Sequence, residues 1–250
     1  MSFILTVKRK FRSWYYALNE NRIVTLRAPA IMHGLKWIVS KRYGRAYFKG
    51  YYEPKIVSCL LANLKDGDSF LDVGGHAGYF SFLVSRISPS GTIITFEPDP
   101  DNSKFIEKIR VLNRVSNVDV VAKGVGSRAG ELAFEKGTTS STGRVRAQGS
   151  FRVPIVTIDD TLRGKPISGS LWLKIDVEGF GGEVIKGATQ TIAQYRPGIL
   201  MELHDQSDER EVLGSLSTHG YTFYNLDQLP ESIDNPHCRL YVAWPGQRSE

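Results

Sequence analysis

The sequence predicts an α/β fold in which a mostly parallel sheet carries helices on both faces. Short apolar runs alternate with segments of helical periodicity from residue 53 to residue 203. The first apolar run, at residues 69–73, leads directly into a glycine-rich turn and then a helix, as buried parallel strands do. An alternation of strands and helices of this length is typical of a parallel sheet covered by helices.

Each element is predicted from its local pattern. Parallel strands are expected at residues 69–73, 92–96, 118–122, 171–177 and 199–203. Helices are expected at residues 53–63, 78–88, 100–112 and 182–195, with Asp99 capping the third and Pro100 at its first position. Alternation at residues 131–135 and 151–158 predicts a β-hairpin insertion with a polar loop at residues 137–150. Residues 221–225 and 240–243 are candidate antiparallel edge strands.

Composition excludes several classes of protein. The 250 residues are 41% hydrophobic and 23% charged, so the chain is not disordered, collagenous or disulfide-rich. Cys59 and Cys238 lie far apart and outside any C-x-x-C pair, which predicts reduced thiols and no structural zinc. No apolar run is long enough to span a bilayer, and the N-terminal charges follow the apolar stretch, unlike those of a signal peptide. We therefore expect a cytoplasmic protein.

The N-terminal segment is unusually basic. Residues 1–50 carry a net charge of +10 and many aromatic side chains, whereas the rest of the chain carries −4. We expect residues 1–49 to form an extension to a domain at residues 50–250. Such a segment could make peripheral contact with an anionic membrane, grip an anionic polymer, or form a solvated basic helix pair on one face of the domain. Nucleic acid is not an expected partner, because no recognised binding motif accompanies the charge.

A ligand site is predicted at the turn after the first strand. The sequence there lacks the G-x-G-x-x-G spacing of dinucleotide sites, because His76 interrupts it. An acid at the strand end suits a ligand with an ammonium or sulfonium, and a second acid at the end of the next strand can accept the hydroxyls of a ribose. The candidate cofactor-binding residues here are Asp72, Gly74, Gly75, His76, Gly78 and Glu97.

Charged residues at the end of the fourth strand are the candidate catalytic groups. Strand alternation puts Lys174, Asp176 and Glu178 on one side of a strand that should otherwise be apolar. His204, with Glu202 on the same face of the fifth strand, is expected to join them. Asp176 and Glu178 are the first candidates for a general base and His204 the next, while a structural Lys174–Asp176 ion pair is the alternative.

Three motifs in this order resemble the FkbM family of S-adenosylmethionine-dependent methyltransferases. They are FLDVGGHAGYFSF, TIITFEPDPDN and LKIDVEGFGGEVIKGA, followed by GILMELH, and the resemblance covers about residues 51–205. It implies a Rossmann-like class I methyltransferase fold, with S-adenosylmethionine across the first two strand ends and a hydroxyl of a sugar, glycan or secondary metabolite as methyl acceptor. Asp72, Gly74 and Gly78 would then flank the methionine and ribose parts, and Glu97 the ribose.

Some alternatives stay open at this point. Glu53 either contacts the cofactor or only begins a helix, where negative charge is favourable. Mg²⁺ on Asp176, Glu178 and Glu202 is possible but not favoured, so no metal site is predicted. An NAD- or nucleotide-sugar-binding oxidoreductase and a non-catalytic S-adenosylmethionine-binding scaffold are the competing functions. The sequence leaves the oligomeric state open.

Overall fold

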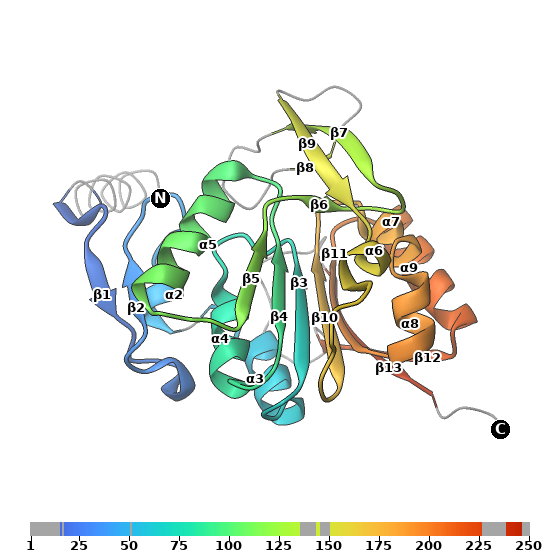
Figure 1. Ribbon diagram of the computed structural model, residues 1–250, viewed down its shortest axis with the longest axis horizontal. Coiled ribbons are helices and arrows are strands. Elements are labelled where there is room, and N and C mark those ends of the chain that lie inside the picture. Colours follow the sequence, from blue (N-terminus) through green and yellow to red (C-terminus); the bar gives the residue numbers. More distant parts are fainter. Residues whose placement is uncertain are drawn as a thin grey trace, which may run out of the picture.

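The computed structural model describes residues 16, 18–50, 52–135, 151–226 and 239–246, and the backbone of residues 144–145. Its centre is a seven-stranded sheet in the order β12-β13-β11-β10-β3-β4-β5 (Figure 1). Five of its strands are parallel and match the predicted ones: β3 (Ser69–Val73), β4 (Ile93–Phe96), β5 (Val118–Val121), β10 (Leu171–Asp176) and β11 (Gly198–Leu203). This confirms the predicted parallel core.

The two C-terminal strands form one end of the sheet. β12 (Tyr221–Asn225) forms the edge, and β13 (Arg239–Pro245) runs antiparallel between β12 and β11. The prediction that both are edge strands is therefore wrong for β13. The reason is its composition: Leu240, Tyr241, Val242 and Ala243 are all buried, which suits an inner strand.

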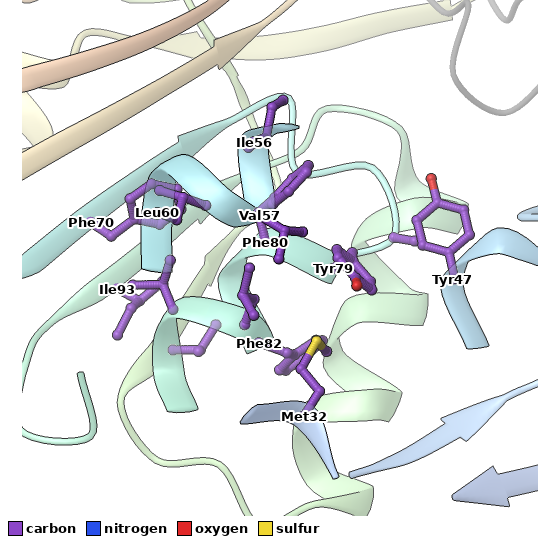
Figure 2. Packing of buried hydrophobic residues seen from close by; sticks show 14 of the residues in the cluster. Met32, Tyr47, Ile56, Val57, Leu60, Phe70, Tyr79, Phe80, Phe82 and Ile93 are labelled. Carbon is purple, nitrogen blue, oxygen red and sulfur yellow. The ribbon is translucent and has the colours of Figure 1, made fainter. Parts of the chain in front are cut away.

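Helices cover both faces of the sheet (Figure 1). On one face, α3 (Pro54–Asn63), α4 (Tyr79–Ile87) and α5 (Pro100–Leu112) bury their apolar side chains. Figure 2 shows this core, where Leu60 of α3 and Phe82 of α4 lie near Phe70 and Ile93 of the sheet. On the other face lie α6 (Ile158–Leu162), α7 (Gly181–Lys186), α8 (Thr189–Tyr195) and α9 (Gln206–Thr218).

The helix predicted at residues 182–195 is two helices. The carbonyl of Gly187 accepts a hydrogen bond from the backbone N–H of Asp159, 3.0 Å away, instead of continuing the helix. The Asp159 carboxylate then accepts the N–H groups of Gln190 and Thr191, which caps α8. The break is set by a residue far away in the sequence. Helix α9, capped by Asp205, was not predicted at all.

The predicted hairpin insertion is present and stands over one end of the sheet. β7 (Gly130–Glu135) and β9 (Phe151–Val156) pair antiparallel, flanked by β6 (Gly124–Val125) and β8 (Arg144–Val145) in a second sheet. Because β6 follows β5 almost directly, this sheet lies above the carboxyl ends of the parallel strands (Figure 1). Most of the predicted polar loop at residues 137–150 lies outside the described residues.

The described part of the basic N-terminal segment is not a helix pair. It contains a short antiparallel pair, β1 (Ile23–Thr25) and β2 (Lys36–Ile38), with η1 (Ala30–Met32) between them and α2 (Ala46–Lys49) after them. Met32 and Tyr47 belong to the same apolar core as α4 (Figure 2), and so does Trp37 of β2. Residues 1–15 lie outside the described residues, so peripheral membrane contact stays a prediction. Among the described residues, no helix has the length and apolar character needed to cross a membrane.

Candidate functional site

A cleft opens at the carboxyl ends of β3, β4 and β10, beneath the insertion. Strand ends and the turns after them provide its polar wall, including Gly74, Glu97 and Asp176. Phe134, Val153 and Ile155 of the insertion, together with Phe180, provide the apolar wall.

The glycine turn brings the backbone close to the neighbouring strand end. Gly74 has φ +84°, and a Cβ there would overlap the backbone carbonyl oxygen of Asp176. A Cβ on Gly75 would overlap the methyl group of Thr95. Gly78 has φ +77° and is the N-cap residue of α4. Only glycine satisfies both the backbone conformation and the space at Gly74, so the turn forms one wall of the cleft with no side chain in the way.

Glu97 is almost fully buried at the cleft wall, with 5% of its surface exposed. One carboxylate oxygen accepts the backbone N–H of His76 at 2.7 Å, and the other accepts that of Asp99 at 2.8 Å. Burial raises the pKa of Glu97 to about 8, although these hydrogen bonds oppose the rise. The carboxyl group is thus fixed in orientation and has lone pairs left for a ligand.

His76 lines the cleft with its imidazole held by the N-terminal segment. Its Nδ1 lies 2.7 Å from the hydroxyl of Tyr47, and its ring packs edge-on to that of Tyr43 at 5.2 Å. Burial lowers the pKa of His76 to about 4, so the ring is neutral at physiological pH. A neutral ring suits a contact with an uncharged part of a ligand.

Asp72 lies behind the cleft wall, not in its lining. Its side chain is 1% exposed and accepts a hydrogen bond from Ser81 at 2.6 Å. Its other oxygen, Oδ1, is buried without a hydrogen-bond partner. The register of β3 and β10 puts Asp72 directly beside Lys174. Burial raises the pKa of Asp72, and the charge of Lys174 opposes this.

Lys174 is the centre of a buried charge cluster. Its ammonium lies 3.2 Å from Asp176 and 3.9 Å from Glu202, and 4.9 Å over the ring of Phe80. Asp176 also contacts Nε2 of His204 at 3.1 Å. Burial would raise the pKa of Asp176, but Lys174 and His204 outweigh this and hold it well below its usual range. Asp176 is therefore ionised and a weak base.

Glu53 and Glu202 are two further acids near Lys174 in this cluster. Burial raises the pKa of both carboxyl groups, and the negative charge of Asp176 raises it further, while Lys174 opposes the rise. The Oε2 atom of Glu53 is buried without a hydrogen-bond partner, and Glu53 itself has φ +41°. The helix after it starts at Pro54 with no side-chain cap, so capping does not explain this residue.

The acids that the sequence suggested for Mg²⁺ do not converge as a set. The described residues that could share an ion are Asp176, Glu202 and His204, with ligand atoms within 4.8 Å of one another, while Glu178 follows the end of β10 and lines the cleft. Lys174 already provides a positive charge to Asp176 and Glu202. Mg²⁺ also prefers oxygen ligands to imidazole nitrogen, so the arrangement favours the ion pair over a metal.

The family model of the methyltransferase FkbM domain matches residues 72–228 of this chain. The chain belongs to the FkbM methyltransferase family. The FkbM match runs from the end of β3 through the other four parallel strands and the insertion, and it includes the glycine turn at residues 74–78. It confirms the family resemblance and the class I methyltransferase fold predicted from the sequence.

Two curated relatives are similar to this FkbM chain. Hexuronic acid methyltransferase AglP of Haloferax volcanii is 25% identical over 168 residues, covering 66% of this chain and 68% of AglP. Methyltransferase sdnD of Sordaria araneosa is 25% identical over 191 residues, covering 62% of this chain and 74% of sdnD. Both names describe methyltransferases, in agreement with the family.

Solved structures share the fold. FkbM from Methylobacillus flagellatus superimposes with a TM-score of 0.55 at 18% identity, over 72% of this chain and 44% of that one. This chain thus spans less than half of that FkbM protein. Precorrin-6y C5,15-methyltransferase of Geobacter metallireducens gives a TM-score of 0.51 at 14% identity, over 81% and 92% of the two chains.

Several residues at the site were not anticipated from the sequence. Tyr52 and Asn102 line the cleft, and Phe134 and Ile155 reach it from the insertion. Asp99 does cap α5, as predicted, but it also pairs with Arg42 at 2.8 Å. No local signal marks these residues, since each reaches the cleft through tertiary contacts.

Proposed function

We propose that this protein is an S-adenosylmethionine-dependent O-methyltransferase that acts on a hydroxyl of a sugar, glycan or related metabolite. The observation that carries the proposal is the cleft where the Gly74 turn, buried Glu97 and the Asp176 cluster meet at neighbouring strand ends. The acceptor class is supported by the similarity to a relative named as a hexuronic acid methyltransferase.

The residues present fit this cofactor. The Gly74 turn gives a bare backbone wall, and Glu97 offers a fixed carboxylate to the two ribose hydroxyls. The unpartnered Oε2 of Glu53 and the acids beside it suit a cationic ammonium. When bound, the cofactor supplies an electrophilic methyl group on sulfur. The protein must then hold the acceptor oxygen in line with the methyl carbon and the sulfur, and it must remove the proton of the acceptor.

His204 is the better base for that proton. Asp176 fixes the ring through Nε2 and stabilises its protonated form, which leaves Nδ1 as the atom to receive a proton. Asp176 itself is too weak a base, because Lys174 and His204 lower its pKa. Glu178 lines the cleft and is the competing candidate.

The competing functions are less well supported. An oxidoreductase of the dinucleotide type would use the G-x-G-x-x-G turn, which His76 interrupts. A scaffold that only binds the cofactor has no need for the contact between Asp176 and His204 beside the cleft.

Calorimetric titration with S-adenosylhomocysteine tests the cofactor assignment. We expect micromolar binding by the wild type, loss of at least tenfold in Glu97→Ala, and no change in the control Glu131→Ala on the exposed insertion strand. A panel of methyl acceptors, neutral glycosides and uronates, then tests the reaction. Absence of binding in the wild type, or equal binding by Glu97→Ala, would overturn the proposal.

A further inference from the structure

The N-terminal segment contacts the cleft residues themselves, although it lies outside the part of the chain matched by the family model. Arg42 donates from Nε to the side-chain oxygen of Asn102 at 2.9 Å and pairs with Asp99 at 2.8 Å. The Tyr43 hydroxyl donates to the same oxygen of Asn102 at 3.1 Å. The family match begins only at residue 72.

These two donors determine which way the Asn102 amide faces. An amide has one oxygen, which accepts, and one nitrogen, which donates. Since Oδ1 already accepts from Arg42 and Tyr43, the group that hydrogen-bonds to Glu97 is the Asn102 NH₂. That bond favours the ionised form of Glu97. The N-terminal segment therefore contacts Asn102, and Asn102 in turn contacts Glu97.

We propose that Arg42 and Tyr43 are positioning residues for the cofactor site: they orient the Asn102 amide so that it donates to the carboxylate that receives the ribose. Part of the basic segment then serves the active site of the domain that follows it. This inference rests on the proposed function for its role in cofactor binding, but the orientation itself is a property of the free protein.

Neighbouring charges agree with this role. Asp99, at the start of α5, faces Glu97 and would raise its pKa further, and Arg42 neutralises Asp99. Tyr43 faces Glu97 from the N-terminal segment, and its own pKa is raised beyond the range of the experiment by burial. His76, in the turn after β3, is neutral above its pKa of about 4. Glu97 is thus the group near this network that titrates around pH 8.

The first experiment needs no ligand. The carboxyl carbon of Glu97 is titrated by NMR in the wild type, in Arg42→Met/Tyr43→Phe and in Arg86→Ala. Arg86 is a matched control, since it also ties the N-terminal segment to the body, through the carbonyl of His33 at 3.0 Å, without reaching Asn102. We expect the double variant to raise the pKa of Glu97 by about one unit and the control to leave it unchanged. An unchanged value in the double variant would overturn the proposal.

The second experiment measures cofactor binding against pH. A one-unit rise in the pKa of Glu97 predicts that the double variant binds S-adenosylhomocysteine roughly eightfold more weakly at pH 7.5 and less than twofold more weakly at pH 9.5. A loss of equal size at both pH values would indicate a merely structural role. In an Asn102→Ala background the double substitution should weaken binding less than it does in the wild type, because only the charge of Asp99, no longer neutralised by Arg42, is then left to act on Glu97. A loss as large and as pH-dependent as in the wild type would contradict the route through Asn102.

The two proposals fail in different ways. If the wild type binds no S-adenosylhomocysteine at any pH while the Glu97 titration shifts as expected, the proposed function fails and the positioning stands. If binding occurs but neither the titration nor the pH profile responds to Arg42→Met/Tyr43→Phe, the positioning fails and the proposed function stands.

Discussion

A Cβ on Gly74 would overlap the backbone carbonyl oxygen of Asp176, so the glycine turn and the end of strand β10 touch through their backbones. The turn forms one wall of the cleft, and the strand carries the charge cluster. A side chain at position 74 would therefore push these two parts of the site apart. A substitution on either side is expected to disturb both.

Gly74→Ala should destabilise the protein by at least about 2 kcal/mol, because it adds both a clash with backbone and an unfavourable φ. Urea unfolding followed by circular dichroism measures this. The control is Gly214→Ala in helix α9, where a Cβ meets nothing within 4 Å; there the stability should rise by roughly 0.5–1 kcal/mol. Equal changes in the free energy of unfolding at the two glycines would show that the close approach to Asp176 does not affect stability.

Lys174→Met should cost about 3–5 kcal/mol at neutral pH, because it leaves Asp176, Glu202 and their neighbours buried without their cation. The deficit should shrink as the pH falls and the carboxyl groups take up protons. The surface pair Lys165–Asp119 provides the control: Lys165→Met should cost less than about 1 kcal/mol. A deficit independent of pH would argue against the charge cluster as its cause.

Glu97 should make the stability of the protein fall as the pH rises. Its pKa is about 8 in the folded state and roughly 4.3 when unfolded, so between these values the folded state binds the extra proton. The stability of the wild type relative to Glu97→Gln should therefore decline between pH 5 and pH 9, by on the order of a few kcal/mol.

Urea unfolding at several pH values checks this. Glu107→Gln is the control, because a hydrogen bond from Arg110 holds the pKa of Glu107 below its usual range and nothing should titrate above pH 5. If the difference in free energy of unfolding between the wild type and Glu97→Gln does not change with pH, Glu97 is ionised in the folded protein over the whole pH range.

His204→Ala should lower kcat by about 10²–10³-fold while S-adenosylhomocysteine affinity changes little, if His204 takes the proton of a hydroxyl. Steady-state kinetics with the acceptor found in the panel measure this, with exposed His33→Ala as the control. If Glu178→Gln abolishes turnover and His204→Ala does not, Glu178 is the base. If neither does, the acceptor group is one that needs no base, such as the carboxylate of a uronate.

Removing divalent metal should leave methyl transfer unchanged, because Lys174 provides the positive charge that an ion on Asp176 and Glu202 would otherwise supply. Activity after dialysis against EDTA, with and without added Mg²⁺, checks this. A loss that Mg²⁺ restores would assign Asp176, Glu202 and His204 as ligands instead.

Local sequence patterns were enough to predict the parallel core, the positions of its strands and the family. Those features depend on short-range patterns: apolar runs, glycines at a strand end, and a proline after Asp99. It also placed Lys174 and Asp176 on one side of a strand, because alternation along a strand is local, and the ion pair between them is present.

The assembly of the site, in contrast, depends on contacts between residues that lie far apart in the chain. The break at Gly187 depends on Asp159, the position of Asp72 behind the cleft depends on Ser81 of α4, and Asn102 is oriented by Arg42 about sixty residues earlier in the chain. Each of these depends on which groups meet after folding and on the burial that then shifts their pKa values. The spacing of residues along the chain shows neither the tertiary contacts nor the burial. The sequence therefore predicted which acids lie at the site but not their roles.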